Sequence, residues 1–414
     1  MGNIIPIGNK QKTALMLRVG GLGDLLILTP IGKALYNKGY KVDYFCGSPT
    51  GKVFELIEGL KYFNSVKELI RVNGIDCITD DDGHLVSVEI LKQNYDEVFD
   101  FKFSVENNKS GLNKDEGWRQ TINSNFQNWI DLSFSWANID PTKVLPQDKL
   151  PEISVKDYTK YVDWFNEATP FKAKNDRDYR IIGVQLQAST LIRSWYKAQD
   201  LPELIHSKYP DDIVAIFANG KWYCLSKYGR QEINFPDGYN HLICSAVLIQ
   251  QMNCFISADS GSSHLAEALE VPTIDVYTTV PAWTRIRDYK YAYPIEPNNV
   301  ECHPCFTLDL FCPIERGKAI ESLTEEERNV LKLVESGINP IEIARKLGTM
   351  VRGVQMQYEA IKKKVEALSA NEPACVRSIT PDKILLKVDD VLGVQPVVKH
   401  LILQDSLLLE DKVS

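Results

Sequence analysis

The sequence predicts an α/β protein with two doubly wound halves and a small helical module inserted near its C-terminal end. Three observations predict this class. Short apolar runs alternate with helical stretches, as in a parallel sheet covered by helices on both faces. The alternation stops in a polar segment at about 105–160 and restarts at residue 180. Residues 319–370 then have a purely helical pattern.

The first half begins with the apolar run TALMLRV at 13–19, which predicts a strand. GGLGD at 20–24 and LLILTPIGKALYNKG at 25–39 predict a glycine loop and then one helix. Further strands are expected at 40–47 and 96–103.

The second half repeats this order. Strands are expected at 180–187, 212–220, 253–260 and 271–279, with a helix at 201–209. The predicted division is an N-terminal domain at 1–165, a C-terminal domain at 175–318 with 372–395, an inserted three-helix module at 319–371 and a tail at 396–414.

The inserted module carries clear helix signals. Thr324 and Glu327 have the spacing of a capping box, which satisfies free N–H groups at a helix start. The first helix is expected to end at Gly337, the second to run over 340–347 behind Asn339, and a longer third to follow Gly348.

Composition excludes several classes. A net charge of -8 argues against a surface built mainly for polyanions. The N-terminus lacks the basic and apolar regions of a signal peptide, and no apolar run reaches the length of a membrane span. A cytoplasmic protein is therefore expected. Because cytosolic thiols stay reduced, clustered cysteines are interpreted as metal ligands before disulfides.

Three polar stretches follow predicted strands. GGLGD places Asp24 at the start of a helix, where spacing alone favours a capping role. QASTLIRSW at 187–195 offers two hydroxyls and a guanidinium, a set that suits phosphate oxygens but also an ordinary polar loop. SADSGSSH at 257–264 ends a strand and begins a helix, whose free N–H groups and dipole attract anions. There His264 is equally a phosphate donor or a packed side chain.

Together these stretches resemble glycosyltransferase family 9, the ADP-heptose:lipopolysaccharide heptosyltransferases and their relatives. The resemblance is carried by LRVGGLGDLLILTP, QASTLIRSW, DSGSSHLAEALEVPTIDVY and the tail ECHPCF…CP…ACVRSITPDKI. It covers nearly the whole chain apart from 319–370 and the C-terminal tail.

The resemblance implies a GT-B fold, in which two Rossmann-like domains face a cleft. It implies an inverting glycosyltransferase in which Asp24 takes the proton from an acceptor hydroxyl. The nucleotide-diphospho-sugar donor, expected to be ADP-heptose, would bind the C-terminal domain without a catalytic metal. The acceptor is a glycan such as lipopolysaccharide core, or a protein. The donor-binding residues implied are Ser189, Thr190, Arg193, Asp259, Ser260, Gly261, Ser263 and His264. Arg193 stands where the family usually has lysine.

The cysteines predict a structural metal site. Cys302, Cys305 and Cys312 have the spacing C-x2-C-x6-C, which lacks a fourth ligand. The resemblance supplies Cys375, displaced by the inserted module. Four thiolates suit zinc and iron equally, and the closed site leaves no role in chemistry.

The inserted module resembles the helix-turn-helix of LuxR-type regulators. Gln355 and Met356 replace the polar or basic groove-reading residues of such regulators, and Gly353 interrupts the recognition helix. These departures favour a protein partner or self-association over nucleic acid.

Two alternatives remain open: a glycosyltransferase that acts on nucleic acid through the module, and a non-catalytic binding protein on a transferase scaffold. Trp118, Trp129 and Trp136 are sugar-stacking or core residues, which the sequence does not separate.

Overall fold

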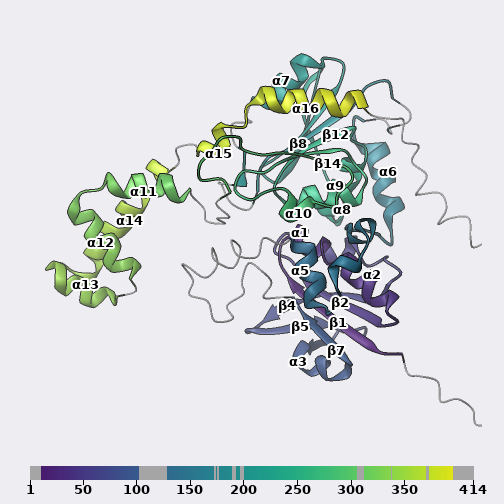
Figure 1. Ribbon diagram of the computed structural model, residues 1–414, viewed down its shortest axis with the longest axis horizontal. Coiled ribbons are helices and arrows are strands. Elements are labelled where there is room, and N and C mark those ends of the chain that lie inside the picture. Colours follow the sequence, from purple (N-terminus) through teal and green to yellow (C-terminus); the bar gives the residue numbers. More distant parts are fainter. Residues whose placement is uncertain are drawn as a thin grey trace, which may run out of the picture.

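The computed structural model of the protein describes residues 11–101, 128–171, 174, 177–188, 193–195, 200–304, 312–336, 338–369 and 373–394. In this part of the chain, helices pack on two main β-sheets, and four further helices project to one side (Figure 1). The predicted mixed α/β class with parallel sheets is confirmed. The division into an acceptor domain and a donor domain stays a prediction.

The first sheet is parallel and has the order β3-β2-β1-β7. Its strands are β1 (Thr13–Val19), β2 (Lys41–Gly47), β3 (Phe63–Glu68) and β7 (Glu97–Asp100). Strand β1 is buried along most of its length, as its apolar run predicts. A small antiparallel sheet, which the sequence did not predict, follows β3; it contains β4 (Ile70–Val72), β5 (Ile75–Thr79) and β6 (Leu85–Ser87).

One helix was expected after the glycine loop, and that prediction is wrong. Helix α1 (Leu22–Leu26) ends and α2 (Thr29–Asn37) begins within this stretch. Pro30 is responsible, because proline has no N–H to donate and its ring collides with the carbonyl four residues earlier. The hydroxyl of Thr29 donates to the carbonyl of Leu26 instead, at 2.8 Å.

The second sheet has seven strands in the order β11-β10-β9-β8-β12-β13-β14. Its parallel strands are β8 (Ile181–Gln185), β9 (Ile213–Ala218), β12 (Cys254–Ala258), β13 (Thr273–Val276) and β14 (Ala292–Ile295). An antiparallel hairpin, also unpredicted, extends one edge with β10 (Lys221–Ser226) and β11 (Gly229–Ile233). Along the parallel strands the chain reverses direction of winding between β8 and β12, where doubly wound sheets bind ligands.

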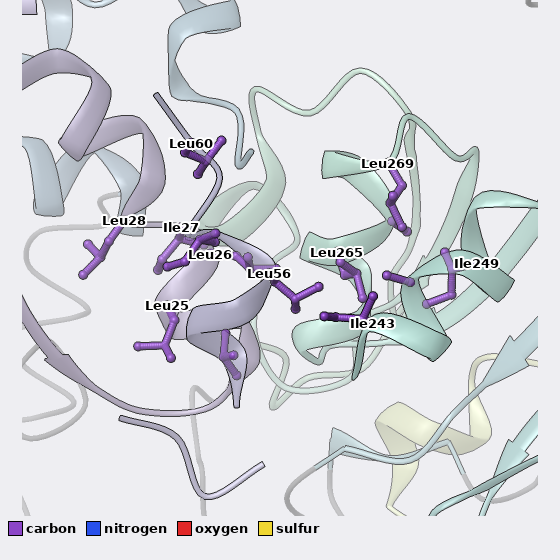
Figure 2. Close-up of a cluster of buried hydrophobic side chains, with 14 of the residues drawn as sticks. Leu25, Leu26, Ile27, Leu28, Leu56, Leu60, Ile243, Ile249, Leu265 and Leu269 are labelled. Atoms are coloured by element: carbon purple, nitrogen blue, oxygen red, sulfur yellow. The ribbon is translucent and has the colours of Figure 1, made fainter. Parts of the chain in front are cut away.

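Helices cover both faces of the second sheet. Helices α7 (Leu201–Lys208) and α16 (Pro381–Val394) pack on one face and share its hydrophobic cluster. Helices α8 (His241–Gln250), α9 (Gly261–Ala268) and α10 (Trp283–Ile286) follow strands on the other side. A cluster of buried apolar side chains joins α8 and α9 to α1, so the two sheets share a core (Figure 2). The remaining helical segments are α3 (Val88–Leu91), α5 (Trp129–Trp136), α6 (Tyr158–Ala168), α15 (Ala374–Arg377), η1 (Val53–Leu56), η2 (Lys92–Asn94), η3 (Pro141–Lys143) and η4 (Pro146–Lys149).

The projecting helices are α11 (Pro313–Glu321), α12 (Glu325–Glu335), α13 (Pro340–Leu347) and α14 (Val351–Ser369) (Figure 1). The Thr324–Glu327 capping box is confirmed, and Asn339 caps α13 through its side-chain oxygen. Gly348 has the left-handed conformation, with φ of 63°, that ends a helix. Gly337 lies outside the described residues. These helices have small buried clusters of their own, and their similarity to a DNA-binding module stays a prediction.

Candidate active site

Asp24 lies in the first turn of α1, beside the carboxyl end of β1. One carboxylate oxygen accepts a hydrogen bond from the backbone N–H of Gly21 at 2.8 Å, and the other pairs with Arg18 at 2.7 Å. The predicted contact with the helix start is present, although Asp24 makes it from the third helical position. Both contacts fix the orientation of the carboxylate. Its role as a base stays a prediction.

Arg18 is a site residue that the sequence analysis missed. Its side chain is buried and donates to the carbonyl of Phe101, at the end of β7, over 2.7 Å. Strands β1 and β7 are neighbours in the first sheet, and the chain reverses direction of winding there. A pocket beside Asp24 is lined by Arg18, Asp24, Ile27, Leu28, Phe101, Trp129 and Ser133. The only signal in the sequence was an arginine inside an otherwise apolar strand.

Arg193 and Asp259 meet at the matching place in the second sheet. Arg193 follows β8 and Asp259 follows β12, so adjacent strand ends deliver them. The guanidinium donates to the Asp259 carboxylate at 2.9 Å and to its backbone carbonyl at 2.6 Å. Burial alone would raise the pKa of Asp259, but Arg193 and the nearby Arg285 lower it below its usual value. Arg193 is therefore partly engaged within the protein.

The serines at the start of α9 form a hydroxyl cluster. Ser260 and Ser262 both donate to the side-chain oxygen of Gln185, at the end of β8. Ser257 lies 2.9 Å from Ser262, between their hydroxyl oxygens. The Ser263 hydroxyl is buried and has no hydrogen-bond partner among the described residues. Gln185 could not be predicted from the sequence, because a polar residue at the end of a strand is common.

His264, the fourth residue of the same helix, is buried inside the protein. Its Nδ1 atom hydrogen-bonds the Tyr289 hydroxyl. Burial lowers the pKa of His264 to about 4, although the Asp259 carboxylate opposes the shift. The imidazole is therefore neutral near pH 7. The contact with Tyr289 agrees with the interpretation of His264 as a packed side chain. Donation to a phosphate stays a prediction.

The two glycine-containing loops lie against each other. A Cβ atom at Gly261 would lie 2.7 Å from the backbone nitrogen of Gly23, and one at Gly23 would lie 2.6 Å from Cδ2 of His264. Such distances leave no room for side chains, so both glycines allow a close approach of α1 and α9. The segments that carry Asp24 and His264 are thus neighbours in space, although more than two hundred residues separate them in the sequence.

Ser189, Thr190 and Cys305 lie outside the described residues, as does Trp118. Burial, and then the Cys312 thiol, raise the pKa of Cys302. Cys375 is buried in the core under α16. The ligand atoms of these three described cysteines do not all lie within 4.8 Å of one another; among described residues that condition is met by Asp80, Asp82 and His84.

Comparison with known proteins supports a glycosyltransferase. Residues 241–310 match the model of glycosyltransferase family 9 (heptosyltransferase). The matched segment holds α8, β12, α9, β13, α10 and β14, and so includes Asp259 and His264. It covers well under half of the chain. No curated protein matches the sequence.

Three solved glycosyltransferase structures match this chain at low sequence identity and low TM-score. The ADP-heptose lipopolysaccharide heptosyltransferase II of E. coli has 12% identity and a TM-score of 0.43, over 70% of this chain and 92% of its own. A family 9 glycosyltransferase of Veillonella parvula has 12% identity and a TM-score of 0.46, over 76% and 90%. The iron-containing dodecameric glycosyltransferase TibC of E. coli has 12% identity and a TM-score of 0.45, over 74% and 71%.

None of the helices in the described ranges has the length and apolar character that crossing a lipid bilayer requires.

Proposed function

We propose that this protein is an inverting glycosyltransferase of the GT-B type, with Asp24 as the base and the α9 loop as the donor site. The observation that carries the proposal is the contact between the two loops. This contact brings the Asp24 carboxylate close to the N-terminus of α9 and to two arginines, Arg193 and Arg285. A carboxylate on one side and anion-binding groups on the other suit transfer from a diphosphate-linked sugar.

In this mechanism Asp24 removes the proton from the acceptor hydroxyl as its oxygen attacks the sugar carbon. The bond between that carbon and the diphosphate oxygen breaks on the opposite face. General-base assistance contributes about 10²–10⁴ in rate. The diphosphate leaves with an added negative charge, which Arg193, Ser189, Thr190 and the N–H groups from Ser260 to Ser263 would stabilise. Preorganised donors of this kind are usually the larger catalytic contribution.

The proposed donor is ADP-heptose, because the matched segment belongs to a heptosyltransferase family. The proposed acceptor is a lipopolysaccharide-core glycan or a protein hydroxyl, and the proposed location is the cytoplasm. We assign the helices from α12 to α14 to binding a protein partner or a second copy. Each sign of charge is well represented on them, and their lysine Lys364 pairs with Glu327 of the same module.

We also propose a structural zinc or iron ion held by Cys302, Cys305, Cys312 and Cys375. The fit to the described residues is partial, because Cys302, Cys312 and Cys375 do not form one tight group among them. Such an ion would tie the segment after β14 to α15, away from the reacting groups. It takes no part in the transfer.

One experiment tests the donor site and the base separately. Thermal melts of the wild type with a panel of nucleotide-sugars should show stabilisation by ADP-linked sugars, worth about 2.7 kcal/mol at a hundred times Kd. Arg193→Ala should abolish the shift relative to its own unliganded melt, which is itself lowered because Asp259 loses its partner. Asp24→Asn should keep the shift and lose transfer by about 10²–10⁴.

The outcomes separate the parts of the proposal. If no nucleotide-sugar shifts the wild type, the donor-site assignment is wrong. If Asp24→Asn transfers sugar at the wild-type rate, Asp24 serves only the Gly21 contact.

A further inference from the structure

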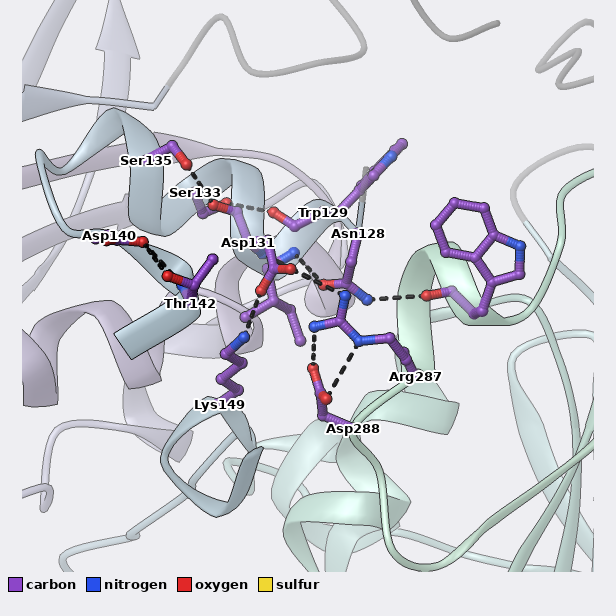
Figure 3. A network of polar contacts seen from close by, with 12 residues as sticks. Asn128, Trp129, Asp131, Ser133, Ser135, Asp140, Thr142, Lys149, Arg287 and Asp288 are labelled. Atoms are coloured by element: carbon purple, nitrogen blue, oxygen red, sulfur yellow. Dashed lines mark hydrogen bonds and ion pairs between the residues drawn. The ribbon is translucent and has the colours of Figure 1, made fainter. Parts of the chain in front are cut away.

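The start of helix α5 is in direct contact with helix α10, which follows a strand of the second sheet. Asn128, its capping residue, accepts hydrogen bonds from Ile130 at 2.9 Å and Asp131 at 3.3 Å. The side-chain amide of Asn128 donates at 2.9 Å to the carbonyl of Trp283, the first residue of α10 (Figure 3). The start of α5 is therefore fixed against α10.

An ion-pair network fixes the same contact from its other side. Asp131 pairs with Arg287, just after α10, at 2.9 Å and with Lys149 at 2.7 Å (Figure 3). Arg287 is also held by Asp288, at 2.7 Å. The first turn of α5 and the α10 segment are thus joined by one hydrogen bond and one ion pair.

Trp129 stands between Asn128 and Asp131 in the sequence, and its side chain has two sets of neighbours. Its ring lines the pocket beside Asp24, together with Phe101 and Ser133. The guanidinium of Arg285, on α10, lies over the same ring. The contact therefore joins the charge of Arg285 to a ring carried by the first half of the chain.

Arg285 is buried, with an exposed fraction of 5%, and its charge reaches the donor loop. It lowers the pKa of both Asp259 and His264. Arg193, Asp259 and Arg285 follow three adjacent strands, β8, β12 and β13, at their carboxyl ends. Doubly wound sheets bind ligands at this edge.

We infer that Arg285 is a second guanidinium for the donor's diphosphate, and that Trp129 is a positioning residue from the first half that holds it in place. This inference rests on the proposed function. It adds that the donor site is completed by α5, so that donor affinity depends on a residue outside the second half of the chain.

Binding of ADP and of inorganic pyrophosphate, measured by calorimetry on the full-length protein, tests the inference. Trp129→Ala and Arg285→Ala should each weaken both ligands on the order of tenfold, the value of a desolvated cation–π contact. Trp129→Phe keeps an aromatic face and should stay within about threefold of the wild type. Ser135→Ala, on the exposed side of α5, should bind normally.

Two controls separate positioning from a general loosening of the interface. Arg287→Ala breaks the ion pair with Asp131 but leaves the stack, and should weaken ADP less than Trp129→Ala does. In the Arg285→Ala background, Trp129→Ala should cost no further affinity, because its effect acts through Arg285.

The inference is overturned if Trp129→Ala and Arg285→Ala fold and bind ADP and pyrophosphate like the wild type, or if their effects add in full. In that case the proposed donor site still stands if Arg193→Ala loses ADP binding. If the wild type binds neither ligand, the donor site and this inference both fall.

Discussion

At the scale of single residues, Asp275 is the buried acid that no motif explains. It lies on β13 with no exposed surface, and neither carboxylate oxygen has a hydrogen-bond partner among the described residues. Burial raises the pKa of Asp275 well above its usual value, and the charges of Glu267 and Asp259 add to the shift. The Ser263 hydroxyl is close enough to oppose the shift but does not meet hydrogen-bond geometry with either oxygen. The folded protein therefore holds a proton that the unfolded chain releases above about pH 4.

This difference gives a pH dependence with a definite sign. Because the folded state binds the extra proton, the free energy of unfolding falls as pH rises above the unfolded value of 3.8 and up through the folded-state pKa. Asp275→Val removes both the unpaired oxygens and the proton. It should raise the free energy of unfolding by about 1–3 kcal/mol near neutral pH.

Urea titrations at pH 5 and pH 8 check this prediction, with the stability difference between variant and wild type larger at pH 8. Asp275→Asn, which cannot ionise, should follow the pH trend of the valine variant. A difference that stays constant with pH would show that Asp275 does not titrate in this range.

The residues near the candidate site could be predicted where a local motif marks them. They could not be predicted where their position depends on packing against distant parts of the chain. Asp24 and Asp259 lie near His264, and their common role in one site stays a prediction. Arg18 and Arg285 have no local pattern in the sequence, because their positions depend on a carbonyl of another strand and on a ring of another helix.

At the scale of elements, the contact between α1 and α9 depends on two glycines. Helix boundaries were predicted best where side-chain signals act within a few residues, as at Thr324, Asn339 and Gly348. The edge strand β11 escaped prediction, because its residues are mostly polar and exposed and it is held by pairing with β10.

Gly261→Ala tests the contact. Its Cβ atom would meet the Gly23 backbone at 2.7 Å, so the two loops must separate. The expected loss is about 1–3 kcal/mol in the free energy of unfolding, with a loss of transfer activity. Urea titration and a transfer assay measure both effects.

Gly317→Ala is the matched control, because it lies in α11 and its Cβ atom would meet no atom within 4 Å. It should be neutral or stabilising by about 0.5–1 kcal/mol. Equal effects of the two substitutions would mean that the α1–α9 contact does not limit the site.

At the scale of the whole molecule, no pattern in the sequence places α1 and α9 side by side. The two points where the sheets reverse their winding carry Arg18 with Asp24 and Arg193 with Asp259. Hydrophobic periodicity predicts each sheet alone, since it reports which side of a strand is buried. It contains no information on which loops of different sheets touch.

The cysteines test a second long-range connection. If Cys375 is the fourth ligand, the chain leaves the metal site after Cys312, forms α11 to α14, and returns to the same site at α15. Closing so long a loop adds little entropy cost, about 0.6 kcal/mol for each doubling of length. Substitution of Cys375 should therefore release the ion as completely as substitution of Cys302.

Metal analysis of purified protein decides the point. The wild type should contain one zinc or iron ion per chain, and Cys302→Ser and Cys375→Ser should each contain almost none. Both variants should also melt at lower temperature, because an ion bound only by the folded state stabilises it. Cys77→Ser, in the small sheet far along the chain from these ligands, should keep the ion. Since Cys375 is buried under α16, a lowered melting temperature alone is also explained by lost packing. The metal content is therefore the deciding measurement: full occupancy in Cys375→Ser would restrict the site to the segment from Cys302 to Cys312 and leave the helices from α11 to α14 outside it.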